Sequence, residues 1–222
     1  MKLKGIFFAL IVAFTLLLIW GVFINKAFLQ KEGEMQGTES PISDCNSLGL
    51  FESHTGCYHP KDCPEDHFPF FIRSGLANVI GPKICFNNKI VMGGIMDNVG
   101  WGLNIVVVKG ETGEILKNEY FNVYSRELSE FLKLIERGSI ILLASFENPE
   151  VVLTEEIREL FAGLGSKMSH AIKKRDTWVF AGAAGVVKER VFEKLVANDE
   201  KSNAYGDWPA MEEVGGCFPR KI

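Results

Sequence analysis

Residues 57–222 alternate between short apolar runs and amphipathic stretches, a pattern typical of a sheet with helices packed against it. Three of the runs, 102–109 (GLNIVVVK), 139–145 (SIILLAS) and 177–181 (TWVFA), are almost continuously apolar and predict strands buried on both faces. The turn residues at 110–113 (GETG) predict a hairpin that joins 102–109 to a returning strand. The predicted strands lie at 68–72, 83–92, 102–109, 114–124, 139–145 and 177–181.

Two longer stretches show the apolar spacing i, i+3, i+4, i+7 of an amphipathic helix. The first is predicted to run over 126–137, with Ser125 as its N-cap and Gly138 as its stop. The second is predicted to run from a Thr154 cap to Leu164, with acidic residues in its first turn. Shorter helices are predicted at 166–174 and 192–196. The residues therefore predict a mixed fold, with a largely buried sheet and helices against it.

The N-terminus has a different pattern from the rest of the chain. Residues 5–24 (GIFFALIVAFTLLLIWGVFI) carry no charge and follow Lys2 and Lys4, which is typical of a secretory signal. Twenty apolar residues are also enough to cross a bilayer once. We therefore expect a signal peptide or a signal anchor over 1–24, a flexible linker over 25–56 and a folded domain over 57–222. On either reading the domain enters an oxidising compartment.

The charge balance excludes one class of partner. Residues 1–30 hold three lysines and no acid, so the remainder has 21 basic against 28 acidic residues. A nucleic-acid binder needs a basic surface to neutralise phosphates. We therefore expect no nucleic-acid partner, and membrane association only if the N-terminal segment is retained.

Five cysteines remain to be explained. In an oxidising compartment the four near patterned segments would form two bridges, with three pairings open. A cluster of His54, Cys57, His59 and Cys63 offers zinc ligands, but its spacings do not match a zinc finger. We expect disulfides and no metal. Cys45 is left over, either free or linking two chains.

Motifs for catalysis are not found in the sequence. There is no G-x-S-x-G elbow and no Walker loop, and Gly163–Gly165 lacks the third glycine of a dinucleotide fingerprint. Glu147 and Glu150 could act as an acid/base pair on a glycoside, or simply be solvated. His170 is predicted to lie on a solvated face. The sequence therefore predicts a protein that is not an enzyme and needs no cofactor.

Several ordered segments resemble a known family. They are SGLANVIGPKICF (74–86), NVGWGLNIVVV (98–108), TGEILKNEYFNVY (112–124), RDTWVFAGAAG (175–185) and Gly216-Cys217. Together they resemble the family-with-sequence-similarity-three group of secreted cytokine-like proteins, over about residues 56–220. The resemblance implies an α+β fold: a compact β-β-α domain of the GG-type lectin (ILEI-like) kind, with two sheets, packed helices and disulfide staples. It also implies the pairs Cys57–Cys85 and Cys63–Cys217.

The related lectin module also implies a sugar-contacting set. Carried onto this chain, its positions are Trp101, Glu147 and Arg175. Trp101 departs from the family pattern, because an arginine is expected there, and an indole can stack on a sugar but donates only once. Trp101 could instead pack at the sheet edge, and Arg175 could form an ion pair with Asp176. Trp178 is predicted to belong to the core.

These observations lead to one expected function and one alternative. The first is a secreted, extracellular, cytokine-like signalling protein that recognises a cell-surface receptor or a glycan, without catalysis. The alternative is a signal-anchored, luminal carbohydrate-binding protein, a single-pass type II membrane protein of the Golgi or endoplasmic reticulum.

Overall fold

The computed structural model describes residues 57, 63–123, 125–185 and 191–220. The signal or anchor predicted over 1–24, the linker predicted over 25–56 and Cys45 lie outside these residues. Within them, no helix is both long enough and apolar enough to cross a bilayer.

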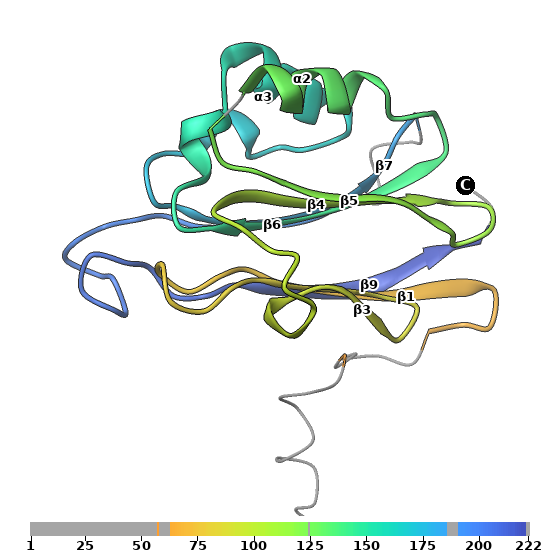
Figure 1. Cartoon of the computed structure of the whole chain (residues 1–222), viewed down its shortest axis with the longest axis horizontal. Coiled ribbons are helices and arrows are strands. Elements are labelled where there is room, and N and C mark those ends of the chain that lie inside the picture. The colour runs from red at the N-terminus through yellow and green to blue at the C-terminus, as the bar shows by residue number, and fades with distance from the viewer. Residues whose placement is uncertain (1–56, 58–62, 124, 186–190, 221–222) are drawn as a thin grey trace, which may run out of the picture. The chain divides into compact units, whose positions relative to one another are not determined.

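The centre of the fold is a five-stranded antiparallel sheet (Figure 1). Its strand order is β5-β4-β6-β7-β8, so the three most apolar strands occupy the middle. All side chains of β6 and β7 are buried, and β4 is buried except at Lys109. The strands are β4 (Gly102–Lys109), β5 (Ile115–Phe121), β6 (Ser139–Phe146), β7 (Thr177–Ala183) and β8 (Phe192–Val196).

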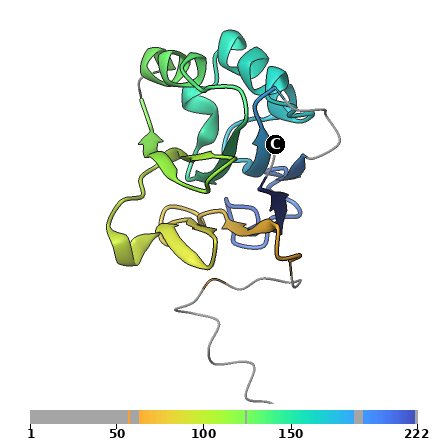
Figure 2. The same ribbon diagram turned by 90° about the vertical axis from the view of Figure 1, so that its right-hand side faces the viewer.

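A four-stranded antiparallel sheet covers one face of this central sheet, and helices cover the other face (Figures 1 and 2). The second sheet has the order β3-β2-β1-β9. It consists of β1 (His67–Arg73), β2 (Lys83–Phe86), β3 (Lys89–Met92) and β9 (Glu213–Pro219). The helical layer consists of α2 (Ser125–Lys133), α3 (Glu155–Gly163) and the 3₁₀ turns η3 (Pro149–Val152) and η4 (Ser169–Ala171), while a further turn, η2 (Gly94–Met96), follows β3. The expected α+β fold of β-β-α type is confirmed.

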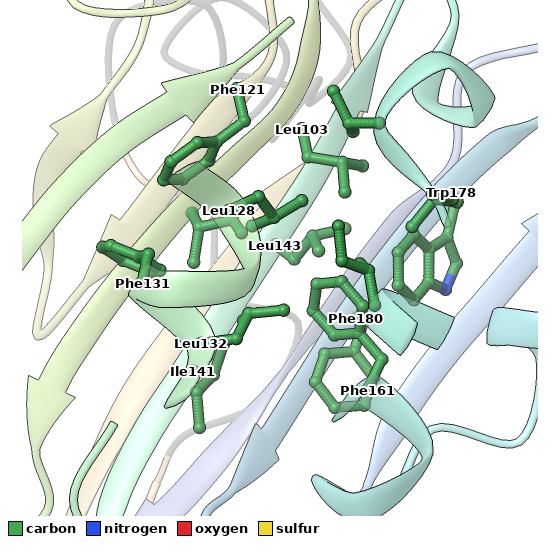
Figure 3. Close-up of a cluster of buried hydrophobic side chains, with 14 of the residues drawn as sticks. Leu103, Phe121, Leu128, Phe131, Leu132, Ile141, Leu143, Phe161, Trp178 and Phe180 are labelled. Atoms are coloured by element: carbon green, nitrogen blue, oxygen red, sulfur yellow. The ribbon is translucent and has the colours of Figure 1, made fainter. Parts of the chain in front are cut away.

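Two apolar cores hold the three layers together. Alternate residues of a strand point to opposite faces, so Leu103 and Ile105 of β4 join the core beneath the helices, whereas Val106 and Val108 join the core between the sheets. Figure 3 shows the helix-side core, where Phe161 of α3 packs edge-on against Trp178 with ring centroids 5.1 Å apart. Trp178 is fully buried, as the sequence predicts. Burial on both faces explains why the central strands are almost continuously apolar.

Two disulfides fasten the segment before β1 to the four-stranded sheet. Cys57 is bonded to Cys85 in β2, and Cys63 is bonded to Cys217 in β9. These two bonds are the connectivity that the resemblance implies, one of the three that the four cysteines allow. The second bridge spans 154 residues of sequence.

The structure corrects the predicted strand over 83–92 and the predicted helix over 126–137. The first is a hairpin of β2 and β3, because Asn87 and Asn88 both adopt positive φ (48° and 62°), as a two-residue hairpin turn requires. The second ends at Lys133, before the predicted Gly138 stop, and Leu134 is 73% exposed.

The predicted helix over 192–196 is wrong, because these residues form β8 and pair with β7. Five residues are too short to nucleate a stable helix, and the edge of β7 offers them a full set of backbone partners. The helix predicted over 166–174 is reduced to the 3₁₀ turn η4. Strand β9 has no clear signal in the sequence.

Candidate functional site

Three neighbouring strands bring Trp101, Glu147 and Arg175 to one end of the central sheet. Trp101 precedes β4, Glu147 follows β6 and Arg175 lies two residues before β7. Because β6 runs antiparallel to both neighbours, its end lies beside the starts of β4 and β7. The pair Gly102↔Phe146 places Trp101 and Glu147 one step beyond the same rung of the β4–β6 ladder.

Two glycines and a buried asparagine position Trp101. A Cβ on Gly100 would lie 2.3 Å from the ring of Tyr120, and one on Gly102, whose φ is +91°, would lie 2.0 Å from the Phe121 carbonyl oxygen. Asn104 closes the turn, since its Nδ2 donates to the Gly100 carbonyl (2.7 Å) and its Oδ1 accepts from the Gly100 N–H (2.9 Å). Trp101 is left 54% exposed at this end of the sheet.

Glu147 and Arg175 both adopt left-handed backbone conformations, each with a φ of 62°. Such conformations are costly for residues other than glycine and persist only where the surroundings impose them. The Arg175 N–H donates to Oδ1 of the buried Asn148 (3.0 Å), which ties the two turns together. The backbone at this sheet end is therefore held in a fixed shape.

The Arg175 guanidinium packs against a loop that follows β8. Its central carbon lies 4.4 Å from the ring centroid of Trp208, and Nη1 lies 3.8 Å from Oδ2 of Asp207. The Arg175 Nε is buried and has no hydrogen-bond partner among the described atoms. A cation over an indole is attracted by the ring's quadrupole, so Trp208 fixes the guanidinium in place.

Asp176 has a different role from the ion pair considered for it. Its Oδ1 accepts from the Asn198 N–H (2.7 Å) and its Oδ2 accepts from the Lys173 N–H (2.8 Å). The carboxylate is buried and fastens the loop after β8 to the start of β7. Asp207, rather than Asp176, lies beside Arg175.

The three predicted residues share one sheet end, but they do not contact one another directly. No hydrogen bond or ion pair joins their side chains within the part of the chain that the structure describes. The contacts of Arg175 with Asp207 and Trp208 were missed by sequence reasoning. The only sign of these contacts in the sequence is Trp208 itself, an isolated tryptophan in a polar segment. Its presence does not show that it packs on Arg175.

The other residues considered from the sequence lie elsewhere. Glu150 is exposed in η3. His170 lies on the surface beside α3, which agrees with the predicted solvated face. Cys57 and Cys63 are oxidised to disulfides and cannot supply zinc thiolates, and their suggested partners His54 and His59 fall outside the described residues.

A separate cavity of about 600 Å³ opens along β9. Phe71 and Met211 supply apolar walls, and an ion pair of 2.6 Å between Lys194 Nζ and Glu212 Oε1 lies at its lining. None of Trp101, Glu147 and Arg175 lines it. This cavity is therefore not part of the candidate site at the sheet end.

Comparisons with known proteins match the same region. Residues 101–186 match the family model described as interleukin-like EMT inducer. The chain is 41% identical over 168 residues to Protein FAM3C of Danio rerio, an alignment that covers 74% of each protein. It is 42% identical over 168 residues to Protein FAM3A of Homo sapiens, covering 74% of this chain and 73% of that protein.

Proposed function

This chain belongs to the FAM3 family, and from that membership we propose that it is a secreted, non-enzymatic, cytokine-like signalling protein whose folded domain binds carbohydrate. The observation that carries the proposal is the convergence of Trp101, Glu147 and Arg175 at the end of strands β4, β6 and β7.

The chemistry of these side chains suits a sugar. An exposed indole can stack on the apolar face of a pyranose. A guanidinium donates several hydrogen bonds to hydroxyl groups, and a carboxylate accepts them. The fixed backbone turns at Glu147 and Arg175 reduce the entropy lost when a ligand binds. Because Trp101 replaces the arginine that the family pattern leads us to expect, we expect a preference for ligands that gain from stacking.

Binding is best tested on a glycan array with the full chain, purified in a mild detergent. We expect selective binding that Arg175→Ala abolishes and Trp101→Ala weakens. Arg126→Ala is the control, because Arg126 is likewise an arginine with a carboxylate neighbour, Glu130, but it lies exposed on α2, in the helical layer. No binding, or binding that Arg175→Ala leaves unchanged, contradicts the carbohydrate proposal.

Secretion is tested by mass spectrometry of conditioned medium from expressing cells. A soluble chain that lacks residues 1–24 is the expected product. The alternative, a signal-anchored luminal carbohydrate-binding protein, is favoured by the uncharged stretch of residues 5–24 behind Lys2 and Lys4. It predicts that the full chain stays with the membrane fraction and that none appears in the medium.

The proposed partners are a cell-surface receptor, a glycan or both, and a second copy linked through Cys45. Since the other four cysteines are paired, Cys45 has no intramolecular cysteine left to bond. Non-reducing electrophoresis of the secreted chain should show a dimer that Cys45→Ser removes. A monomer in both samples contradicts the linkage.

Hydrolysis of any member of a glycoside panel would contradict the non-enzymatic assignment.

A further inference from the structure

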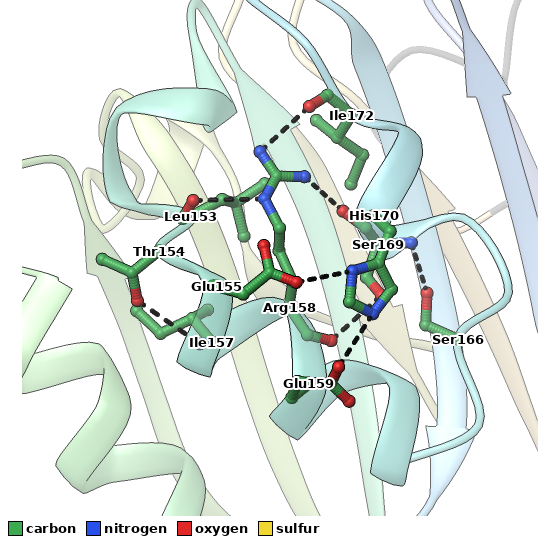
Figure 4. A network of polar contacts seen from close by, with 10 residues as sticks. All are labelled: Leu153, Thr154, Glu155, Ile157, Arg158, Glu159, Ser166, Ser169, His170 and Ile172. Carbon is green, nitrogen blue, oxygen red and sulfur yellow. Dashed lines mark hydrogen bonds and ion pairs between the residues drawn. The ribbon is translucent and has the colours of Figure 1, made fainter.

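Three groups that can ligate a metal converge on the exposed surface of α3 (Figure 4). Glu155 and Glu159 lie one helical turn apart, and His170 reaches them from η4. His170 Nδ1 lies 3.2 Å from Oε1 of Glu155, and its Nε2 lies 3.8 Å from Oε1 of Glu159. The imidazole ring therefore lies between the two carboxylates.

The backbone that carries His170 is fixed to the helix that carries the glutamates. Arg158 donates from Nη1 to the Ser169 carbonyl and from Nη2 to the Ile172 carbonyl (3.0 Å), while its Nε donates to the Leu153 carbonyl (3.3 Å). The buried Ser169 returns a hydrogen bond from its Oγ to the Arg158 carbonyl (3.0 Å). Only side-chain rotation is then needed to bring the three groups onto one ion.

No lysine or arginine in the described part of the chain forms an ion pair with Glu155 or Glu159. Among the described residues, His170 is the only basic side chain within ion-pair distance of Glu155 or Glu159. Arg158 uses its donors on backbone carbonyls, and Lys133 of α2 pairs with Glu156 instead. When the imidazole is neutral, the pair therefore holds two negative charges that a dication would neutralise.

We propose that Glu155, Glu159 and His170 bind a divalent transition-metal ion of the zinc class. One imidazole nitrogen and one oxygen from each carboxylate are ligands that zinc accepts, whereas Ca²⁺ and Mg²⁺ prefer oxygen alone. Tetrahedral ligands about 2.0–2.1 Å from zinc lie about 3.3 Å from one another. The His170–Glu155 distance already matches that value, and one ligand atom of each residue lies within 4.8 Å of the other two.

Such an ion would cross-link η4 to α3 and leave a fourth position for water. The site lies on the helical layer and shares no residue with the sheet-end set. Metal binding and carbohydrate binding can therefore be tested independently.

Zinc titration of the full chain by calorimetry tests this site. We expect a saturable site in the wild-type chain that His170→Ala, Glu155→Gln and Glu159→Gln each weaken by about tenfold or more. Glu156→Gln is the matched control, because Glu156 lies on the same helix but pairs with Lys133. Ca²⁺ and Mg²⁺ should not compete at equal concentration.

A spectroscopic readout separates this site from any zinc bound by the other histidines. In imidazole-selective NMR, the His170 resonances should shift with Zn²⁺ at the same concentrations in the wild-type chain and in Glu156→Gln, and should need about tenfold more Zn²⁺ or higher to shift in Glu159→Gln. The proposal is overturned if no saturable binding occurs up to about 1 mM Zn²⁺, or if His170→Ala binds zinc as the wild type does.

Discussion

The guanidinium of Arg175 lies over the ring of Trp208, with 4.4 Å between the guanidinium carbon and the ring centroid. In the sequence the two residues are separated by β7, β8 and the loop that follows β8. An arginine that the resemblance assigns to sugar contact is therefore already part of a cation–π pair. Its orientation depends on a loop that has no counterpart among the predicted elements.

This pair should be measurable as a coupling energy. We expect the double-mutant cycle of Arg175→Ala and Trp208→Ala to give a coupling of about 0.5–1 kcal/mol in the free energy of unfolding, the usual range for a cation–π pair near the surface. Urea unfolding of the four proteins provides the measurement. Trp208→Phe should retain part of the coupling, because it keeps an aromatic face. Strict additivity would show that the two side chains do not interact in solution.

Gly102 is expected to be one of the least replaceable residues near the site. Gly102→Ala should lower the free energy of unfolding by about 2 kcal/mol or more, because it adds a Cβ at positive φ against a backbone carbonyl. Gly163→Ala is the control: it ends α3 with open space around its Cβ position, and it should be neutral or slightly stabilising. Thermal and urea denaturation report both values. Equal effects of the two changes would contradict the argument.

The two disulfides should differ in their contribution to stability. In the chain-entropy model a bridge across 28 residues stabilises by about 3.5 kcal/mol and one across 154 residues by about 5 kcal/mol. Cys63→Ser with Cys217→Ser should therefore be more destabilising than Cys57→Ser with Cys85→Ser. Denaturant unfolding under non-reducing conditions measures the loss of unfolding free energy in each double variant. A larger loss in the Cys57→Ser, Cys85→Ser variant would contradict the chain-entropy argument.

Lys83 should make the stability depend on pH in the alkaline range. Lys83 is 7% exposed on β2 and lies opposite Arg73 of β1. Burial lowers the pKa of its ammonium group, the nearby charge of Arg73 lowers it further, and the charge of Glu213 partly offsets the two. Between that lowered pKa and the usual value near 10.5, the unfolded chain binds the proton more tightly than the folded chain does. The wild type should therefore gain stability relative to Lys83→Met as the pH rises through this window.

A pair of urea titrations, at neutral pH and at about pH 10, measures that difference. Other titrating groups are common to both proteins and cancel in the comparison. The quantity compared is the free energy of unfolding of the wild type minus that of Lys83→Met. If this quantity stays constant or falls as the pH rises, the burial argument is contradicted.

The central strands could be predicted because burial on both faces leaves a direct trace in the sequence. The run GLNIVVVK has no polar face to mark a helix, and β4 matches its predicted bounds. Thr154 was likewise predictable as a cap, since its Oγ1 accepts from the Ile157 N–H. Local chemistry determines both features.

Pairing between distant segments could not be predicted in the same way. Phe192–Val196 forms a strand only because β7 offers it an edge, and β9 includes two adjacent glycines of low strand propensity whose partner, β1, lies far away in sequence. For the candidate site, the resemblance supplied Trp101, Glu147 and Arg175, and the register brings them to one sheet end. Trp208 and Asp207 depend on how a loop folds back, which no local pattern encodes.

Among the described residues β1 is the first strand and β9 is the last, yet they are neighbours along their whole length, from His67↔Pro219 to Arg73↔Glu213. A chain emerging from the ribosome can complete β4, β5 and β6 while β1 still lacks this partner. The second neighbour of β1, and the Cys63–Cys217 bond beside it, become available only once β9 has been synthesised. Closure of the four-stranded sheet must therefore wait for the synthesis of β9, and a chain terminated before β9 would leave β1 as an open edge.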